Sequence, residues 1–262
     1  MTENKAETHD SFPAFQGRTA VVTGGTHGMG RAIAETLLAG GAEVLLTGRN
    51  SERVQQARDE LDSPAAHVVR SDAAVRAEID ALGITAEQRL GHIDYLFVNH
   101  GIAEFQTLDE ATEDHWDRIF DINAKGAFFT VQRLAPLLRD GGGIVFTTVS
   151  NDRIFPGLSA YSAAKEAVRA FARVLAAELL PRNIRVNAVA PGFILTPSMG
   201  VAQLTEQERA EFIREGESTT PMGRPGTMQE VADAAIYLAA TATFTTGVEL
   251  AVDGGFAQGI GG

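Results

Sequence analysis

Tyr161 and Lys165 are the two side chains whose types and spacing point most directly to chemistry. They lie four residues apart in a stretch with a helical pattern, so both project from one helix face and approach each other. A phenol has a pKa of about 10, but a neighbouring ammonium favours its ionised form. Such a phenol can give a proton to a carbonyl oxygen as a hydride reaches the carbon, or take one from an alcohol in reverse. The same spacing also arises by chance on many helices, so its meaning depends on the rest of the chain.

A glycine-rich loop near the start of the chain has the composition of a phosphate-binding turn. It reads Thr23-Gly-Gly-Thr-His-Gly-Met-Gly30 and joins an apolar strand to a helix. Its glycines permit a tight turn, a close approach of backbone to a pyrophosphate, and close packing of the helix on the sheet. The helix N-terminus adds free N–H groups and positive potential. The loop therefore predicts a dinucleotide site, whereas the same glycines without the strand and helix would indicate only a turn.

The order of strand and helix patterns indicates the fold that must position these residues. Strand patterns at 19–23, 44–47, 67–70, 93–98, 144–149 and 184–189 alternate with helical ones, including 116–138 and 161–180. Such alternation predicts βαβ units and a parallel sheet covered on both faces. We expect an α/β fold: a single doubly wound, Rossmann-type domain over residues 17–262, with about seven parallel strands and helices on both faces. Residues 1–16 have the composition of a flexible N-terminal tail.

With the loop spacing T-G-x-x-x-G-x-G and the tyrosine–lysine pair, the chain resembles the short-chain dehydrogenase/reductase family. The resemblance covers nearly all of Gly17 to Phe256, with its motifs in the family's order. Asn99-His100-Gly101 is similar to the family's N-A-G, with histidine in place of the usual alanine. Pro191-Gly192 with Thr196 is similar to the P-G-x-x-x-T stretch that faces the nicotinamide, and Val252-Asp-Gly-Gly255 to the C-terminal strand and turn.

The resemblance implies two further catalytic residues. The family serine that orients the substrate oxygen stands 13 residues before the tyrosine, and this position is Thr148. Threonine keeps the hydroxyl but adds a methyl group and a stiffer χ1. Ser150 shares the same strand face if the chain stays extended, so it remains the rival. Asn123 matches the asparagine that interrupts a helix and positions a water between the lysine and solvent. The expected catalytic set is Asn123, Thr148, Tyr161 and Lys165.

The end of the second strand bears on which dinucleotide is used. NAD-selective sites place a carboxylate about 20 residues after the glycines, where it takes the ribose hydroxyls. This chain has Gly48 and then Arg49, whose guanidinium is available to pair with a 2′-phosphate. His27 stands where NADP-dependent relatives often carry a basic residue. These features favour NADP(H), with NAD(H) as the alternative if Arg49 is a solvated charge and His27 only fills the loop.

The expected cofactor contacts combine these arguments with the resemblance, which gives Asp72 the adenine and Lys165 the nicotinamide ribose. They are Gly24, Thr26, His27, Gly28, Met29, Gly30, Arg49, Asp72, Ala73, Asn99, His100, Gly101, Tyr161, Lys165, Pro191, Gly192, Ile194 and Thr196.

The sequence allows more than one role for several other side chains near the expected site. His100 either fills space or contacts the ribose or the substrate. Phe155, Phe193 and Met199 are candidates for an apolar pocket wall, and Arg153 for attracting an acidic substrate.

The composition argues against several classes of function. Acidic residues number 34 against 22 basic ones, for a net charge of −12, which repels phosphate backbones and anionic lipid. We therefore expect no nucleic-acid or membrane partner. The chain has no cysteine, and its six histidines lack metal-ligand spacing, so we expect no metal site. The lack of cysteine, signal peptide and long apolar run fits a cytoplasmic location.

The expected function is hydride transfer between NAD(P)(H) and a small-molecule carbonyl or secondary alcohol. An NAD-linked alcohol dehydrogenase is the alternative within this class. A non-catalytic dinucleotide sensor or scaffold would not need Tyr161, Lys165 and Asn123 together. Enoyl-type reductases of the family space tyrosine and lysine by seven residues rather than four. The resemblance also implies a homotetramer, or a homodimer.

Overall fold

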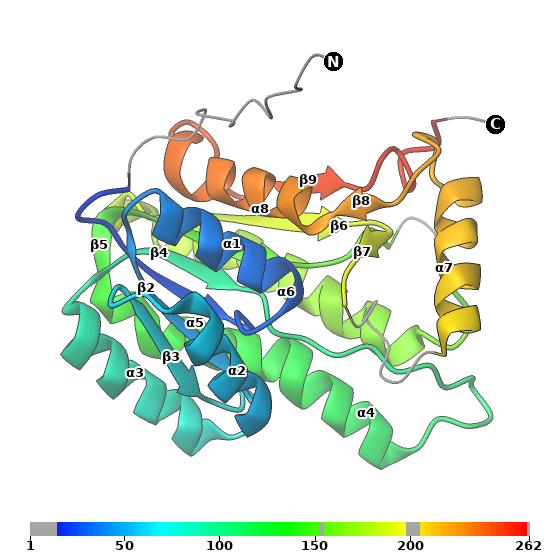
Figure 1. The fold of residues 1–262 in the computed structure, drawn as a ribbon, viewed down its shortest axis with the longest axis horizontal. Coiled ribbons are helices and arrows are strands. Elements are labelled where there is room, and N and C mark those ends of the chain that lie inside the picture. Colours follow the sequence, from blue (N-terminus) through cyan, green and yellow to red (C-terminus); the bar gives the residue numbers. More distant parts are fainter. Residues whose placement is uncertain (1–14, 152–154, 198–204, 261–262) are drawn as a thin grey trace, which may run out of the picture.

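One seven-stranded parallel sheet forms the centre of the computed structural model, which describes residues 15–151, 155–197 and 205–260 (Figure 1). Its strand order is β3-β2-β1-β4-β5-β6-β9. These strands are β1 (Thr19–Thr23), β2 (Glu43–Gly48), β3 (Ala66–Arg70), β4 (Ile93–Val98), β5 (Leu138–Thr147), β6 (Arg185–Pro191) and β9 (Glu249–Val252). A separate parallel pair joins β7 (Ile194–Leu195) to β8 (Gly226–Thr227). The predicted doubly wound, Rossmann-type fold is confirmed.

Helices cover both faces of the sheet, as Figure 1 shows. They are α1 (Gly28–Ala39), α2 (Ser51–Leu61), α3 (Arg76–Leu90), α4 (Glu113–Phe120), α5 (Gly126–Leu134), α6 (Ser159–Glu178), α7 (Glu206–Thr219) and α8 (Met228–Ile236), with short π or 3₁₀ turns η1 (Asp121–Lys125), η2 (Ala135–Leu137), η3 (Leu180–Arg182) and η4 (Tyr237–Thr241). Helices α1, α2 and α8 share one apolar core, whereas α3, α5 and α6 share the other. Both faces are buried, which explains why the strands are continuously apolar rather than alternating.

Strand β5 shows how alternation assigns side chains to the two faces. Val145 packs in the core beneath α1 and α8, whereas Ile144 and Phe146 pack beneath α6. Thr148, immediately after the strand, continues the series of Ile144 and Phe146 toward α6.

The structure departs from two expectations about the ends of elements. Phe15 was expected in the flexible tail, but it is buried, and its ring makes an edge-to-face contact with Tyr95 at 6.1 Å. The single helix expected over 116–138 is broken into α4, η1 and α5, and β5 already begins at Leu138. The break falls at the π turn that contains Asn123, the residue that the family resemblance implies as a helix interruption.

Among the described helices, none is long and apolar enough to cross a membrane.

Candidate active site

The glycine loop is folded tightly against the turn that follows β4. Gly24 has a φ of +64°, and a Cβ there would lie 2.9 Å from the Cα of His100. At Gly30, a Cβ would collide with the side-chain nitrogen of Asn99 and with the carbonyl of Gly24. Glycine is therefore required at both positions. The loop leaves its backbone free at the start of α1, the arrangement that suits a pyrophosphate.

Asn99 joins the ends of three neighbouring strands. Its Nδ2 donates to the carbonyl of Gly24 at 3.2 Å, and its Oδ1 accepts from Thr147 Oγ1 at 3.1 Å. Its backbone N–H donates to Thr23 Oγ1 at 3.1 Å. These contacts hold the carboxyl ends of β1, β4 and β5 together, where a doubly wound sheet binds its ligand.

Lys165 and Tyr161 lie on one face of α6, as their spacing predicts. The buried ammonium of Lys165 donates to the carbonyl of Thr147 at 2.8 Å and lies 5.8 Å from the centre of the Tyr161 ring. Burial raises the pKa of Tyr161 to about 12 and lowers that of Lys165 to about 8. Burial is the cause of this shift in Tyr161, and the expected lowering of its pKa by the ammonium is not seen, so the protonated phenol is the favoured form. A protonated phenol is the form that can donate to a carbonyl oxygen.

Asn123 occupies the π turn between α4 and α5. Its Nδ2 donates to the carbonyls of Ile119 and Ile102 at 2.9 Å each, and its Oδ1 accepts the N–H of Ile102 at 3.1 Å. The side chain thus pairs backbone groups at the helix break and in the segment after β4. Gly101 packs between the two polar side chains: a Cβ there would lie 2.6 Å from Asn123 Oδ1 and 3.1 Å from Lys165 Nζ. Asn123, Gly101 and Lys165 are therefore brought together.

Thr148 and Ser150 both direct their hydroxyls toward β6 and β9. Thr148 Oγ1 lies 2.5 Å from Glu249 Oε1 and 3.0 Å from the carbonyl of Val189. Ser150 Oγ lies 3.3 Å from Asp253 Oδ2. Each hydroxyl has an acidic partner more than 100 residues away, on or just after β9, which the sequence did not indicate.

Sequence reasoning missed one basic residue beside the glycine loop, Arg53. Arg49 is exposed directly after β2, as expected. His27 Nε2 lies 3.1 Å from Arg53 Nη1, so the first turn of α2 brings Arg53 to the glycine loop. Burial, followed by the charge of Arg53, lowers the pKa of His27. Asn50 Oδ1 accepts the N–H of Arg53 and so fixes where α2 begins, but no local pattern indicates the contact of Arg53 with His27.

The remaining expected cofactor contacts surround this loop. Thr196 lies against Gly28, where a Cβ would be 3.9 Å from Thr196 Cβ, so the segment after β6 crosses over the glycine loop. Gly192 abuts Asp253, where a Cβ would be 2.7 Å from the Asp253 Cβ. Asp72 Oδ1 accepts the N–H of Ala74 at 3.0 Å, which shapes the turn after β3. The other expected contacts lie in the glycine loop (Thr26), in the first turn of α1 (Met29), in the turn after β3 (Ala73), at the end of β6 (Pro191) and at the start of β7 (Ile194).

His100 is held beside the catalytic residues in its neutral form. Its Nδ1 lies 2.7 Å from Thr23 Oγ1, and its buried Nε2 has no hydrogen-bond partner among the described residues. Burial, followed by the charge of Lys165, lowers the pKa of His100 to about 4. Both the space-filling and the ligand-contacting roles remain compatible with this position.

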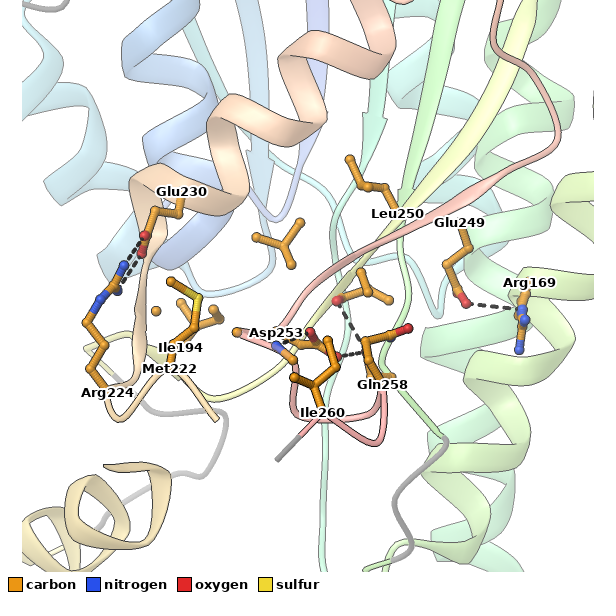
Figure 2. A pocket seen from close by; sticks show the side chains of 17 residues that line it. Arg169, Ile194, Met222, Arg224, Glu230, Glu249, Leu250, Asp253, Gln258 and Ile260 are labelled. Atoms are coloured by element: carbon orange, nitrogen blue, oxygen red, sulfur yellow. Dashed lines mark hydrogen bonds and ion pairs between the residues drawn. The ribbon is translucent and has the colours of Figure 1, made fainter. Parts of the chain in front are cut away.

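A cavity of about 650 Å³ lies on the outer side of β6, along β9 (Figure 2). Its described lining includes Ser150, Ile194, Glu249 and Asp253, but none of the glycine-loop residues. It therefore lies behind the predicted catalytic hydroxyls rather than over the glycine loop. Phe155 and Phe193, two residues of the expected apolar wall, contact each other edge to face at 6.2 Å. Met199 and Arg153 lie outside the described residues.

Within the described residues, no cluster of His, Cys, Asp and Glu has the arrangement of a metal site.

Comparison with known proteins shows which family the chain resembles over its length. A family model described as enoyl-(acyl carrier protein) reductase matches residues 24–257. The NADP-dependent (R)-specific alcohol dehydrogenase of Lentilactobacillus kefiri is 32% identical over 92% of this chain and 97% of its own length. A short-chain dehydrogenase/reductase structure from Brucella melitensis superposes with a TM-score of 0.84 at 32% identity, covering 93% of this chain and 98% of that one. A 3-ketoacyl-(acyl-carrier-protein) reductase from the same organism, complexed with NADH, gives 0.83 at 28% identity over 93% and 99% of the two chains.

The family model, the relatives and the solved structures each cover nearly the whole chain. This chain therefore belongs to the short-chain dehydrogenase/reductase family, and it is an NAD(P)-dependent oxidoreductase of carbonyl and alcohol groups.

Proposed function

We propose that this enzyme prefers NADP(H) over NAD(H) and interconverts a small-molecule ketone and its secondary alcohol. The observation that carries the preference is the presence of two exposed arginines, Arg49 directly after β2 and Arg53 in the first turn of α2, where Arg53 contacts His27 of the glycine loop. The residues Gly48-Arg49-Asn50 carry no carboxylate that would repel a 2′-phosphate. A guanidinium pairs with phosphate through several donors at once, so the arrangement suits the phosphorylated dinucleotide.

The residues of the site fit such a cofactor. The tight packing of Gly24 and Gly30 against the Asn99 turn leaves backbone rather than side chains facing the phosphates. Lys165 stands where it can hold the ribose, and the segment containing Thr196 closes over Gly28. The bound dinucleotide supplies or accepts the hydride.

The chain's own residues then manage the proton and the substrate oxygen. In reduction, Tyr161 donates its phenolic proton to the carbonyl oxygen, because burial keeps that phenol protonated. Lys165, adjacent to its ring, stabilises the phenolate that remains. Asn123 fixes the segment after β4 next to Lys165. The family resemblance assigns Thr148 to the reacting oxygen. Oxidation of an alcohol runs through the same groups in the opposite order.

A binding titration tests the cofactor proposal. Purified protein is titrated with NADPH and then with NADH, following the fluorescence of the reduced nicotinamide. We expect tighter binding of NADPH, and we expect Arg49→Ala to remove that preference while Arg89→Ala, an exposed arginine on α3, leaves it intact. Equal or tighter binding of NADH would shift the assignment to an NAD-linked alcohol dehydrogenase. Binding of neither would refute the dinucleotide site itself.

A substrate screen tests the reaction. Relatives include a 3α-hydroxysteroid dehydrogenase of Mediterraneibacter gnavus and a 2-(S)-hydroxypropyl-CoM dehydrogenase of Xanthobacter autotrophicus, so the panel combines a 3-ketosteroid, acetophenone and an acetoacetyl thioester. We expect reduction of at least one ketone, lost in Tyr161→Phe. A crotonyl thioester in the same panel tests for enoyl reduction. Tight cofactor binding without turnover of any member would favour the sensor or scaffold.

We also propose that the protein forms a homotetramer or homodimer in the cytoplasm. Support for assembly comes from the exposed apolar side chains Val174 on α6 and Leu250 on the edge strand β9. Light scattering of the purified protein and fractionation of the source cells test these two points.

A further inference from the structure

Three phenylalanines form an aromatic cluster at the carboxyl edge of the sheet, and each follows a different strand. Phe155 comes after β5, Phe193 after β6 and Phe256 after β9, and these strands are neighbours in the sheet. The rings of Phe155 and Phe256 stack with their centres 5.8 Å apart and 8° between their planes. Phe193 meets both rings edge to face, at 6.2 and 5.1 Å. A doubly wound sheet binds its ligand at this edge, so the cluster borders that region.

The turn after β9 returns Phe256 to this cluster. The carboxylate of Asp253 is buried and accepts the N–H groups of Gly255 at 2.9 Å and Ala257 at 3.0 Å. It also accepts from Ser150 Oγ at 3.3 Å, which ties the turn to the loop after β5. The N–H of Phe256 donates to the carbonyl of Asp253 at 3.1 Å. Phe256 is therefore held in a defined place relative to the loop that carries Phe155.

The three rings differ in their exposure to solvent. Phe193 and Phe256 are 9% and 7% exposed, so packing within the protein covers nearly all of their surface. Phe155 is only half-buried, and its ring rests on that of Phe256. Phe155 is therefore the member of the cluster with surface left for a ligand, and Phe256 supports its ring.

The chain brings Phe155 close to the predicted catalytic residues. Thr148 stands seven residues before it, and Tyr161 six residues after it, in the first turn of α6. The carbonyl of Phe155 accepts the N–H of Leu158 at 3.2 Å, and the carbonyl of Leu158 accepts the N–H of Ser162 at 2.8 Å. Phe155 thus belongs to the turn that leads directly into the helix of Tyr161.

A fourth phenylalanine, Phe105, extends the apolar surface toward the loop after β4. It is 54% exposed, and its Cδ1 would lie 3.4 Å from a Cβ at Gly157. The N–H of Gln106 donates to the carbonyl of Gly157 at 2.9 Å, which joins the two loops. Partly exposed rings therefore follow both β4 and β5, and such surface gains free energy when an apolar group covers it.

We propose that the substrate is a ketone whose larger substituent is a flat apolar group, such as an aromatic ring, that this group packs on Phe155, and that Phe256 is a positioning residue that holds the Phe155 ring. Aromatic rings pack well with their centres about 4.5–7 Å apart, so an aryl ketone suits this wall better than a small alkyl ketone. This inference rests on the proposed reduction of a ketone with Tyr161 as the proton donor.

Acetophenone and 2-butanone test the substrate class, because both are methyl ketones and differ in the group that would cover Phe155. At saturating reduced cofactor, we expect a KM at least about tenfold lower for acetophenone. Phe155→Ala should lower kcat/KM about tenfold for acetophenone and at most about twofold for 2-butanone. An acetophenone KM equal to or above that of 2-butanone, or an equal loss for both ketones in the variant, would overturn the inference.

Phe256→Leu tests the positioning role. Leucine keeps an apolar side chain at this buried place and loses the stacking on Phe155. The contact acts on substrate binding rather than on the proton or hydride, so we expect the KM for acetophenone to rise about fivefold while kcat stays the same. The dissociation constant of the cofactor should not change. A fall in kcat with an unchanged KM would overturn the positioning role.

Phe15→Leu is the matched control. Phe15 is also buried and also meets an aromatic ring, that of Tyr95, but it lies before β1, at the opposite edge of the sheet. We expect this variant to keep the KM of the wild type for acetophenone. A fivefold rise in both variants would overturn the proposal, because it would show a general effect of loosening a buried aromatic contact.

A double-mutant cycle connects the two residues. Because Phe256 acts through Phe155, adding Phe256→Leu to Phe155→Ala should raise the KM for acetophenone no further. Increases that multiply would overturn the positioning role. A wild-type enzyme that reduces 2-butanone or the acetoacetyl thioester but binds acetophenone no better would overturn this inference alone. A wild-type enzyme that reduces no ketone would overturn the proposed function as well, so the two failures are distinguishable.

Discussion

Gly101→Ala tests whether the packing between Asn123 and Lys165 sets the geometry of the active site. The added Cβ would lie 2.6 Å from Asn123 Oδ1 and 3.1 Å from Lys165 Nζ, where ordinary van der Waals contacts begin at 3.4 Å. Both side chains are buried and hydrogen-bonded, so neither can turn into solvent. One of them must therefore move, and it must stretch or lose a hydrogen bond when it does.

The size of the effect follows from these contacts. A lost buried hydrogen bond costs about 1–3 kcal/mol of stability. A shift of about 1 Å in a catalytic group costs about 100-fold in rate. We therefore expect Gly101→Ala to stay folded, with a kcat about 100-fold lower and a nearly unchanged dissociation constant for the cofactor.

The assay is initial-rate reduction of the best ketone at saturating NADPH, followed by absorbance, with stability measured by urea denaturation. Gly141→Ala is the control: its φ is +84°, nothing lies within 4 Å of its Cβ, and it is remote from Lys165. Alanine in that conformation costs about 1 kcal/mol of stability, and kcat should not change. A Gly101→Ala enzyme with a kcat within twofold of the wild type would refute this account of the site.

Three further predictions concern the cofactor, pH and the N-terminal boundary. Arg53→Ala should weaken NADPH binding about tenfold with little effect on NADH binding, because one charged contact is lost. Equal losses of affinity for both cofactors in the titration would contradict the place of Arg53 at the 2′-phosphate. Burial acts to raise the pKa of Asp94, but hydrogen bonds from the Thr19 N–H and Arg18 outweigh it and hold that pKa below its ordinary value. The resulting stability is present above the unfolded pKa of about 4 and is lost as pH falls through the lower folded value. Asp94→Asn should therefore lose about 2 kcal/mol at pH 7 by urea denaturation, with a smaller difference from wild type below pH about 3; a difference independent of pH would contradict this. Phe15→Ala should cost about 3 kcal/mol by the same measurement, as for a buried aromatic ring, and an unchanged unfolding midpoint would place Phe15 outside the core.

Local patterns predicted well those features whose partners lie close in the sequence. Tyr161 and Lys165 meet because residues four apart on a helix share a face, whatever the helix packs against. The glycine loop was recognised for the same reason, since its strand, turn and helix follow one another directly. Alternation of strands and helices was enough to predict the parallel sheet, because parallel neighbours require a crossover between them.

Features that depend on distant partners were not readable from the chain. Arg53 reaches His27 only because β1 and β2 are adjacent in the sheet. The family resemblance implied a helix break at Asn123, but the pairing of its side chain with the backbone of Ile102, in the segment after β4, came only from the structure. Phe15 looked like part of a polar tail, yet it packs against Tyr95 of β4.

The sequence by itself determined the fold class, the dinucleotide loop and the tyrosine–lysine pair, because short-range geometry and periodicity encode them. Only the tertiary structure decided the protonation of Tyr161 and the partner of Thr148. The first depends on how the surrounding elements bury the phenol, which raises the tyrosine pKa. The second depends on β6 lying between β5 and β9, so that the loop after β5 meets a carboxylate 101 residues further along the chain. Sheet order sets such contacts, and no local pattern records it.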